Sequence, residues 1–112
     1  MLTISDLEEI SAARLQDAQV LCAAGRFDGA YYLAGYSLEL ALKARICQTL
    51  NWTDFPATNK EFERFRSFKV HDLEVLLKLS GLEAAVKDRQ LAEWGTAKAW
   101  QPEVRYRQVG FA

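Results

Sequence analysis

The sequence predicts an all-α protein, folded as an up-and-down bundle of four to five helices. The strongest sign is the stretch 28–50, in which apolar residues recur at three- and four-residue steps without a proline. A second periodic stretch precedes it, and only Gly25, Arg26 and Phe27 separate the two. So short a connection favours two helices packed antiparallel. A length of 112 residues suits one domain, so we expect a single helical domain over residues 1–112.

The first helix is expected over residues 5–24. Ser5 and Glu8 have the spacing of a capping box, in which each side chain bonds the backbone N–H of the other residue. Gly25 follows the last apolar residue and can end the helix in a left-handed conformation. Between these signals lies an apolar stripe that should face the core: Leu7, Ile10, Leu15, Ala18, Leu21 and Cys22.

The second helix, expected over residues 28–50 with Asp28 as its N-cap, is apolar around nearly its whole circumference. This pattern is typical of a helix enclosed by several others. Gly35 costs about 1 kcal/mol relative to Ala in a helix interior, so we expect a neighbouring helix to approach closely there. Glu39 and Lys43 are the exceptions in this stretch. Their four-residue spacing, with the acid first, favours an ion pair.

Residues 51–70 change character, with Pro56, several turn residues and five aromatic residues. We expect these aromatics to hold an irregular connection against the core. A compact helix is then predicted over residues 72–79, ended by Gly81, and another over residues 82–100, which Gly95 can break or kink. Pro102 prevents this last helix from continuing.

Charge, cysteines and hydropathy exclude several classes of function. A formal net charge of −1 gives no overall field for nucleic acid, so such binding needs a local basic patch. Cys22 and Cys47 stand apart and the chain has one histidine, so no zinc ligand set can form. We expect two buried free thiols in a reducing cytosol. Neither a signal peptide nor a membrane span is recognisable, so the prediction is a cytoplasmic protein without cofactor.

Three blocks of sequence carry a resemblance to a known family. The first and most specific, FDGAYYLAGYSLELALKARI, begins at Phe27 and contains Glu39 and Lys43. The second, HDLEVLLKLSGLE, begins at His71, and the third, WQPEVRYR, contains the Arg105-Tyr106 pair. In this order the blocks cover much of the chain. They resemble the HEPN family (higher eukaryotes and prokaryotes nucleotide-binding).

The resemblance implies a small helical bundle that is commonly a homodimer. Many members belong to toxin–antitoxin, phage-defence or RNA-processing systems, so a cognate antitoxin or a nucleotidyltransferase is an implied partner. Some members are metal-independent endoribonucleases, and others only bind nucleotide or RNA. Similar members usually carry a further helix after the Arg-Tyr block, whereas this sequence ends at Ala112. Either the domain is naturally short, the sequence is truncated, or a partner chain covers the apolar groove that a missing helix would expose. Such an exposed apolar groove would favour self-association.

The resemblance also implies a catalytic alternative. Active HEPN ribonucleases have Arg, four to six intervening residues, and then His, and Arg66 with His71 fits this spacing. Arg64 fits it as an alternate. The histidine would transfer a proton at the RNA 2′-hydroxyl, and the arginine would stabilise charge on the phosphate, without a metal. The opposing interpretation is that His71 caps or packs against the helix that follows it.

Two further groups are candidates for nucleotide or RNA binding. Lys43 could bind phosphate while Glu39 orients it, or the two form a buried ion pair that only sets helix register. Arg105 and Tyr106, with Lys69, could form a phosphate-binding surface with an aromatic ring for stacking, or could be solvated charge. A purely structural interaction module remains the alternative to both binding and catalysis.

Overall fold

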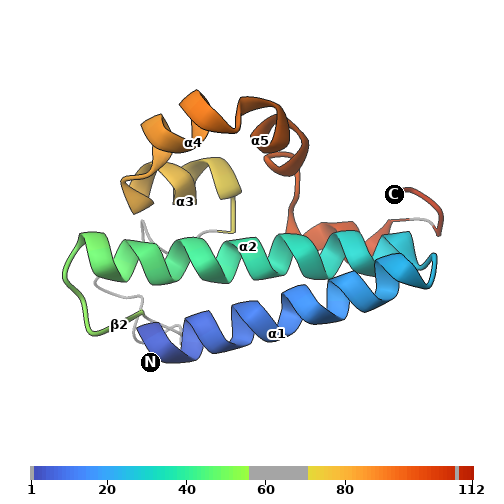
Figure 1. Cartoon of the computed structure of the whole chain (residues 1–112), viewed down its shortest axis with the longest axis horizontal. Helices are drawn as coiled ribbons and strands as arrows, with labels where there is room; N and C mark the ends of the chain where they lie inside the picture. Colours follow the sequence, from blue (N-terminus) through green and yellow to red (C-terminus); the bar gives the residue numbers. More distant parts are fainter. Residues whose placement is uncertain (1, 56–70, 108) are drawn as a thin grey trace.

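Two long antiparallel helices form the frame of the molecule. The computed structural model describes residues 2–55, 71–107 and 109–112. Helix α1 (Ile4–Ala23) and helix α2 (Phe27–Thr49) lie side by side along the longest axis (Figure 1). Gly25 turns the chain between them with φ of 76°, a conformation that favours glycine. The predicted helical hairpin and the all-α class are confirmed.

Ser11 and Ser37 join the two long helices at mid-length. The Ser11 hydroxyl donates to the Ser37 carbonyl oxygen at 2.8 Å, and the Ser37 hydroxyl donates to the Ser11 carbonyl oxygen at 2.7 Å. Both side chains are buried. Serine side chains are short, and both hydroxyls are hydrogen-bonded. The helices can therefore approach closely without leaving a buried hydroxyl unpaired.

The first helix begins earlier than the sequence indicated. Its capping box is formed by Thr3 and Asp6, not by Ser5 and Glu8. Strand β1 (Leu2–Thr3) pairs antiparallel with strand β2 (Asp54–Phe55), with Thr3 opposite Asp54. This pairing holds Thr3 in the extended conformation that an N-cap needs, so the long-range contact selects the earlier cap.

The predicted cap of the second helix is also wrong. Arg26 occupies the N-cap position of α2 and makes no side-chain capping bond. Asp28 lies in the first turn, and its carboxylate accepts the backbone N–H groups of Gly110 and Ala112 at 2.5 and 3.0 Å. These two bonds hold the pKa of Asp28 below its usual value of 3.8. Asp28 therefore fastens the end of the chain to the start of α2.

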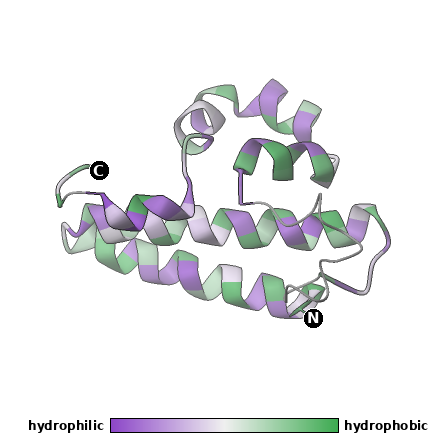
Figure 2. Cartoon of the chain, turned by 180° about the vertical axis from the view of Figure 1, so that it is seen from behind, coloured by the Kyte–Doolittle hydropathy of each residue, from purple (hydrophilic) through white to green (hydrophobic). Residues whose placement is uncertain are grey.

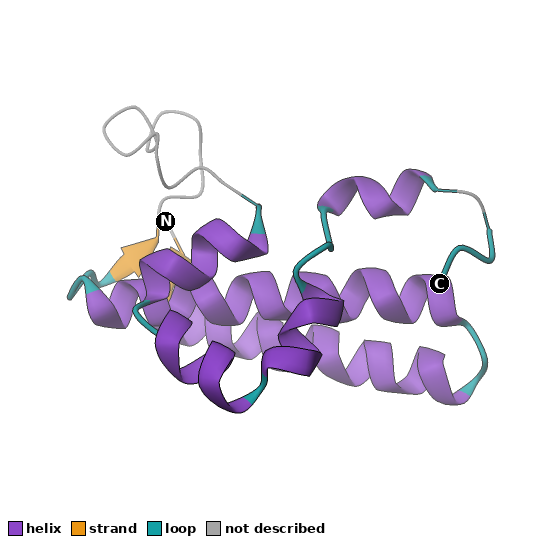
Figure 3. Cartoon of the chain, turned by 90° about the horizontal axis from the view of Figure 1, so that it is seen from above, coloured by secondary structure: helices purple, strands orange, loops and turns teal. Residues whose placement is uncertain are grey.

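Shorter helices cover α2 on the side away from α1 (Figures 1 and 3). Helix α3 (Leu73–Ser80) begins at the cap Asp72 and ends at Gly81, whose φ is 80°. Helices α4 (Glu83–Arg89) and α5 (Leu91–Ala97) follow, and the 3₁₀ helix η3 (Pro102–Tyr106) lies along α2. The compact helix after residue 71 and its glycine stop are confirmed.

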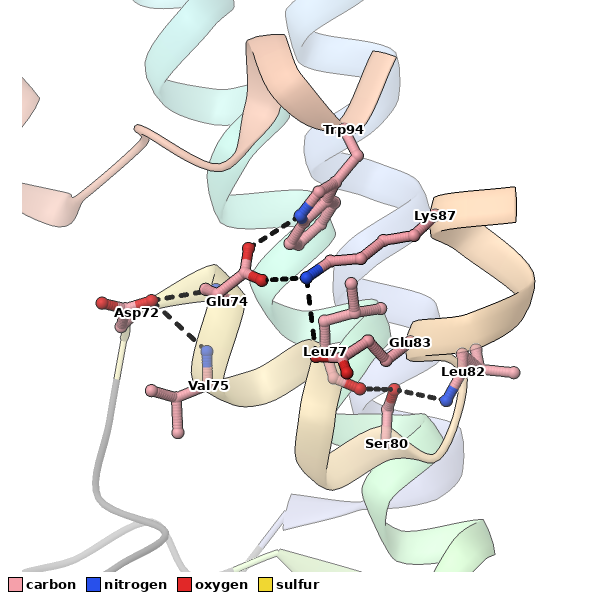
Figure 4. A network of polar contacts seen from close by, with 9 residues as sticks. All are labelled: Asp72, Glu74, Val75, Leu77, Ser80, Leu82, Glu83, Lys87 and Trp94. Atoms are coloured by element: carbon pink, nitrogen blue, oxygen red, sulfur yellow. Dashed lines mark hydrogen bonds and ion pairs between the residues drawn. The ribbon is translucent and has the colours of Figure 1, made fainter. Parts of the chain in front are cut away.

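The expected single helix over residues 82–100 is instead two. The break falls at Gln90, with φ of −135° and ψ of 40°, whereas Gly95 lies inside α5. Tertiary contacts join both helices to α3. Trp94 donates from its indole Nε1 to the Glu74 carboxylate at 2.8 Å, and Lys87 bonds the other oxygen of Glu74 (Figure 4). One acidic side chain on α3 thus binds one residue of α4 and one residue of α5.

Helix α2 is enclosed on two sides but not all round. Helices α1 and α3 pack on two sides of it. Its buried apolar side chains in this half are Leu40, Leu42, Ala44, Ile46 and Cys47. In Figure 2, green segments of α2 alternate with paler and purple ones along the helix. Between these sides an exposed strip remains, and it includes Ala34 and Ala41. The prediction of near-complete enclosure was therefore too strong, although α2 is the middle layer.

The two cysteines differ in exposure. Cys47 is buried, and burial raises the pKa of its thiol, but Cys22 is exposed, so the prediction of two buried cysteines is half wrong.

The connection after α2 is described only as far as residue 55. Phe55 is buried and packs against Trp52, as expected of the aromatics in this connection. Residues 56–70 lie outside the described residues. No helix in the described ranges is long and apolar enough to cross a membrane.

Candidate functional site

One side of α2 carries a row of polar and aromatic side chains. Tyr32, Tyr36, Glu39 and Lys43 follow one another at steps of four, three and four residues, which places them on one helix face. At a rise of 1.5 Å per residue the row is about 16 Å long. The rings of Tyr32 and Tyr36 are parallel, with centroids 6.5 Å apart. We call these four residues the α2 row.

Glu39 lies at the centre of the α2 row and is 2% exposed. One carboxylate oxygen, Oε2, accepts a hydrogen bond from Lys43 Nζ at 3.0 Å, which confirms the predicted ion pair. The other oxygen, Oε1, lies 2.9 Å from His71 Nδ1. Both oxygens of a buried carboxylate are therefore bonded, as its burial requires.

His71 reaches Glu39 from the segment that leads into α3. The cap of α3 is Asp72, whose Oδ1 accepts the backbone N–H of Glu74 at 2.9 Å. Of the interpretation that His71 caps or packs against this helix, the capping half is therefore wrong. The His71 side chain is 57% exposed, so its ring contacts Glu39 on one side and solvent on the other.

Lys43 is far less accessible than His71, with 12% of its side chain exposed. Its ammonium group bonds Glu39 and lies 5.4 Å from the centroid of the Phe55 ring, in a cation–π contact. Phe55 itself is held by the pairing of β1 with β2. The small N-terminal sheet thus closes one end of the α2 row over the lysine.

Arg105 stands at the other end of the α2 row. It is carried by η3, which the buried side chains of Trp100 and Val104 anchor to α2. Its guanidinium Nη1 lies 3.4 Å from the Tyr32 hydroxyl, and the group stacks on the Tyr106 ring at 4.9 Å. This hydrogen bond to Tyr32 raises the pKa of Arg105. Tyr106 is 76% exposed, so the cation and the ring are both open to a ligand.

The five described candidates therefore come together along one side of one helix. Glu39, Lys43 and His71 are directly bonded, and Arg105 with Tyr106 meets the same row at Tyr32. The remaining candidates, Arg64, Arg66 and Lys69, lie outside the described residues.

The sequence interpretation missed Tyr32 and Tyr36 as site residues. Their signal was available, because they share helical spacing with Glu39 and Lys43. Burial, together with the nearby Glu39 carboxylate, raises the pKa of Tyr36, so its hydroxyl stays protonated near neutral pH.

This site offers hydrogen-bond donors and aromatic rings. Within residues 2–55, 71–107 and 109–112, no three side chains of the metal-binding types are grouped to hold an ion. Arginine can bond phosphate through two parallel N–H groups, and exposed rings can stack on bases. Comparisons with family models, curated proteins and solved structures return no match for this chain.

Proposed function

We propose that this protein is a HEPN-like domain that binds phosphate groups of nucleotide or RNA along the α2 row. The observation that carries the proposal is the meeting of three separate sequence blocks on this row. Glu39 and Lys43 come from α2, His71 precedes α3, and Arg105 comes from η3. These are the same blocks on which the family resemblance rests.

The arrangement suits an anionic ligand with planar bases. Arg105 offers an exposed guanidinium, and its contacts to Tyr32 and Tyr106 hold it in place. Tyr106 presents an exposed ring beside that cation. The negative charge of Glu39 is balanced by Lys43, so it does not repel a phosphate at the neighbouring His71.

Binding of labelled single-stranded RNA and of ATP, followed by fluorescence anisotropy and calorimetry, tests the proposal. Arg105→Ala should weaken binding by about fivefold or more, and binding should fall as salt rises. Arg89→Ala is the matched control, because Arg89 is an exposed arginine on α4. No binding of either probe at low salt would reject the proposal and favour a purely structural interaction module.

An exposed apolar strip supports the homodimer that belongs to this proposal. Ala12 of α1 and Ala41 of α2 line one depression between the two helices, together with the polar residues Glu8, Ser11, Arg45 and Gln48. Leu15 continues the strip along α1 and is 46% exposed, and Ala34 continues it along α2. Burying such a strip against a second copy would remove apolar surface from water. A dimer of this kind would act in a cytoplasmic defence or toxin–antitoxin system, beside a cognate antitoxin or nucleotidyltransferase.

A second candidate function is a metal-independent endoribonuclease, and the contact between Glu39 and His71 favours it. A carboxylate that holds one ring nitrogen of an exposed histidine is a common arrangement for proton transfer. Arg66, or Arg64 as its alternate, would then stabilise charge on the phosphate. His71→Ala should abolish RNA cleavage and the toxicity of induced expression. Unchanged toxicity in that variant would reject this candidate.

A further inference from the structure

Glu39 and Lys43 of the α2 row and His71, which bonds Glu39, are unequally accessible. His71 is 57% exposed at its side chain, whereas Lys43 is 12% and Glu39 3% exposed. We infer that Glu39 and Lys43 are positioning residues that do not contact the ligand: Glu39 fixes the proton of His71 on Nδ1, Lys43 neutralises Glu39, and His71 Nε2 meets the phosphate-bearing ligand. The inference rests on the proposed function for the identity of that ligand.

The tautomer follows from the contact to Glu39. An ionised carboxylate carries no hydrogen and can only accept a hydrogen bond. The 2.9 Å contact between His71 Nδ1 and Glu39 Oε1 is therefore a bond in which Nδ1–H donates. A neutral imidazole has a single N–H, so its Nε2 is left with a lone pair. This nitrogen can accept a proton from a ribose hydroxyl, and once protonated it can donate to a phosphate oxygen.

The role of Lys43 follows from the charges. Its ammonium group balances the Glu39 carboxylate at 3.0 Å, and the Phe55 ring covers it at 5.4 Å from the centroid. With neutral His71 the three side chains carry no net charge, and with protonated His71 they carry one positive charge, so neither state repels an anion. Nε2 donates a hydrogen bond to a phosphate oxygen in the protonated state. Without Lys43, an uncompensated carboxylate would stand directly behind the histidine and repel phosphate.

Nuclear magnetic resonance of the ¹⁵N-labelled chain tests the tautomer without any ligand. His71 is the one histidine of the sequence, so its two ring nitrogens give a single pair of signals. At a pH where the ring is neutral, Nδ1 should be the protonated nitrogen. Glu39→Ala should move the ring toward the Nε2–H tautomer, which histidine prefers in water. A wild-type ring with its proton on Nε2 would overturn the inference.

A charge cycle with labelled single-stranded RNA as the probe tests the role of Lys43. Lys43→Met should weaken binding by about tenfold, equivalent to about 1.4 kcal/mol. Glu39→Gln with Lys43→Met should recover most of that loss, because the carboxylate that Lys43 balanced is gone. If the double variant binds as weakly as Lys43→Met alone, Lys43 itself contacts the phosphate and the inference fails.

Two controls separate misfolding and a wrong function from a wrong inference. Lys43→Arg keeps the charge and should bind RNA like the wild type, and circular dichroism checks the fold of each variant. If the wild type binds no RNA while Nδ1 is protonated, the proposed function and the ligand role of Nε2 fail, and the positioning of His71 by Glu39 stands. If RNA binds while Nε2 is protonated, the positioning fails and the proposed function stands.

Discussion

The indole of Trp100 lies directly on the backbone of Gly35. A Cβ at position 35 would come within 2.1 to 2.3 Å of three indole atoms, and the indole is almost fully buried. The predicted close approach at Gly35 is therefore made by the side chain of Trp100, which lies in the segment before η3, and not by a neighbouring helix. Because η3 carries Arg105, this contact links the packing of α2 to one end of the candidate site.

Gly35→Ala should destabilise the protein, although alanine favours a helix more than glycine by about 1 kcal/mol. The added methyl group would displace a buried indole, and overpacking of this kind costs about 1–3 kcal/mol. Urea unfolding followed by circular dichroism measures the change. Gly95→Ala in α5 is the matched control, because nothing lies within 4 Å of its added Cβ, and it should be neutral or stabilising. A Gly35→Ala variant as stable as the wild type would contradict the packing described.

Ser11 and Ser37 should be energetically coupled. Replacing either by Ala removes one buried hydroxyl and the hydrogen bond that it donates to the carbonyl oxygen of the other serine, at a cost of about 1 kcal/mol. Both hydroxyls share one contact region, so the double variant should lose less than the sum of the single losses. A double-mutant cycle on the free energy of unfolding checks this, and strict additivity would refute the coupling.

The end of the chain should detach from α2 in acid. Asp28 has a folded-state pKa below 3.8, because its carboxylate accepts the N–H groups of Gly110 and Ala112. A lowered pKa means that the contribution is complete above the unfolded value and is lost as pH falls through the folded value. The amide signal of Gly110 should therefore titrate with a midpoint below 3.8. In Asp28→Asn this titration should be absent. A midpoint at or above 3.8 in the wild type would count against the hydrogen bonds between Asp28 and the backbone of residues 110 and 112.

Self-association, if it uses the exposed strip, should respond to a charge at its centre. Ala41→Glu should weaken dimerisation by about tenfold or more, since the interface would have to remove a carboxylate from water, and the nearby Arg45 already bonds Gln48. Ala84→Glu on α4 is the matched control, because Ala84 is also exposed and lies away from the strip. Light scattering at micromolar concentrations measures both. A wild-type monomer at high micromolar concentration would show that the strip is not a dimer interface.

Local signals explain the parts of the fold that the sequence predicted. The short turn at Gly25, the stop at Gly81 and the pair of Glu39 with Lys43 each depend on residues close together in the chain. Two of the failures involve distant contacts. Thr3 became the cap because β1 pairs with residues about 50 positions later, and Asp28 does not cap α2 because its carboxylate bonds the backbone of residues 110 and 112.

The candidate site also combines contacts that are local in the sequence with contacts between distant residues. Periodicity placed Glu39 and Lys43 on one face of α2, but nothing local indicated that His71, 32 residues later, would bond Glu39. The approach of Arg105 to Tyr32 spans 73 residues and was equally invisible in the pattern. The sequence identified the three blocks, and only the fold showed that they meet along α2.

Mapping amide and ring signals during titration with a short single-stranded RNA tests the central claim most directly. The account predicts that the signals which change most belong to Tyr36, His71 and Arg105, at low salt, and that the changes shrink as salt rises. Signals of α4 should stay in place. An absence of changes at low salt, or changes centred on α4 and α5, would contradict the assignment of the α2 row as the phosphate-binding site.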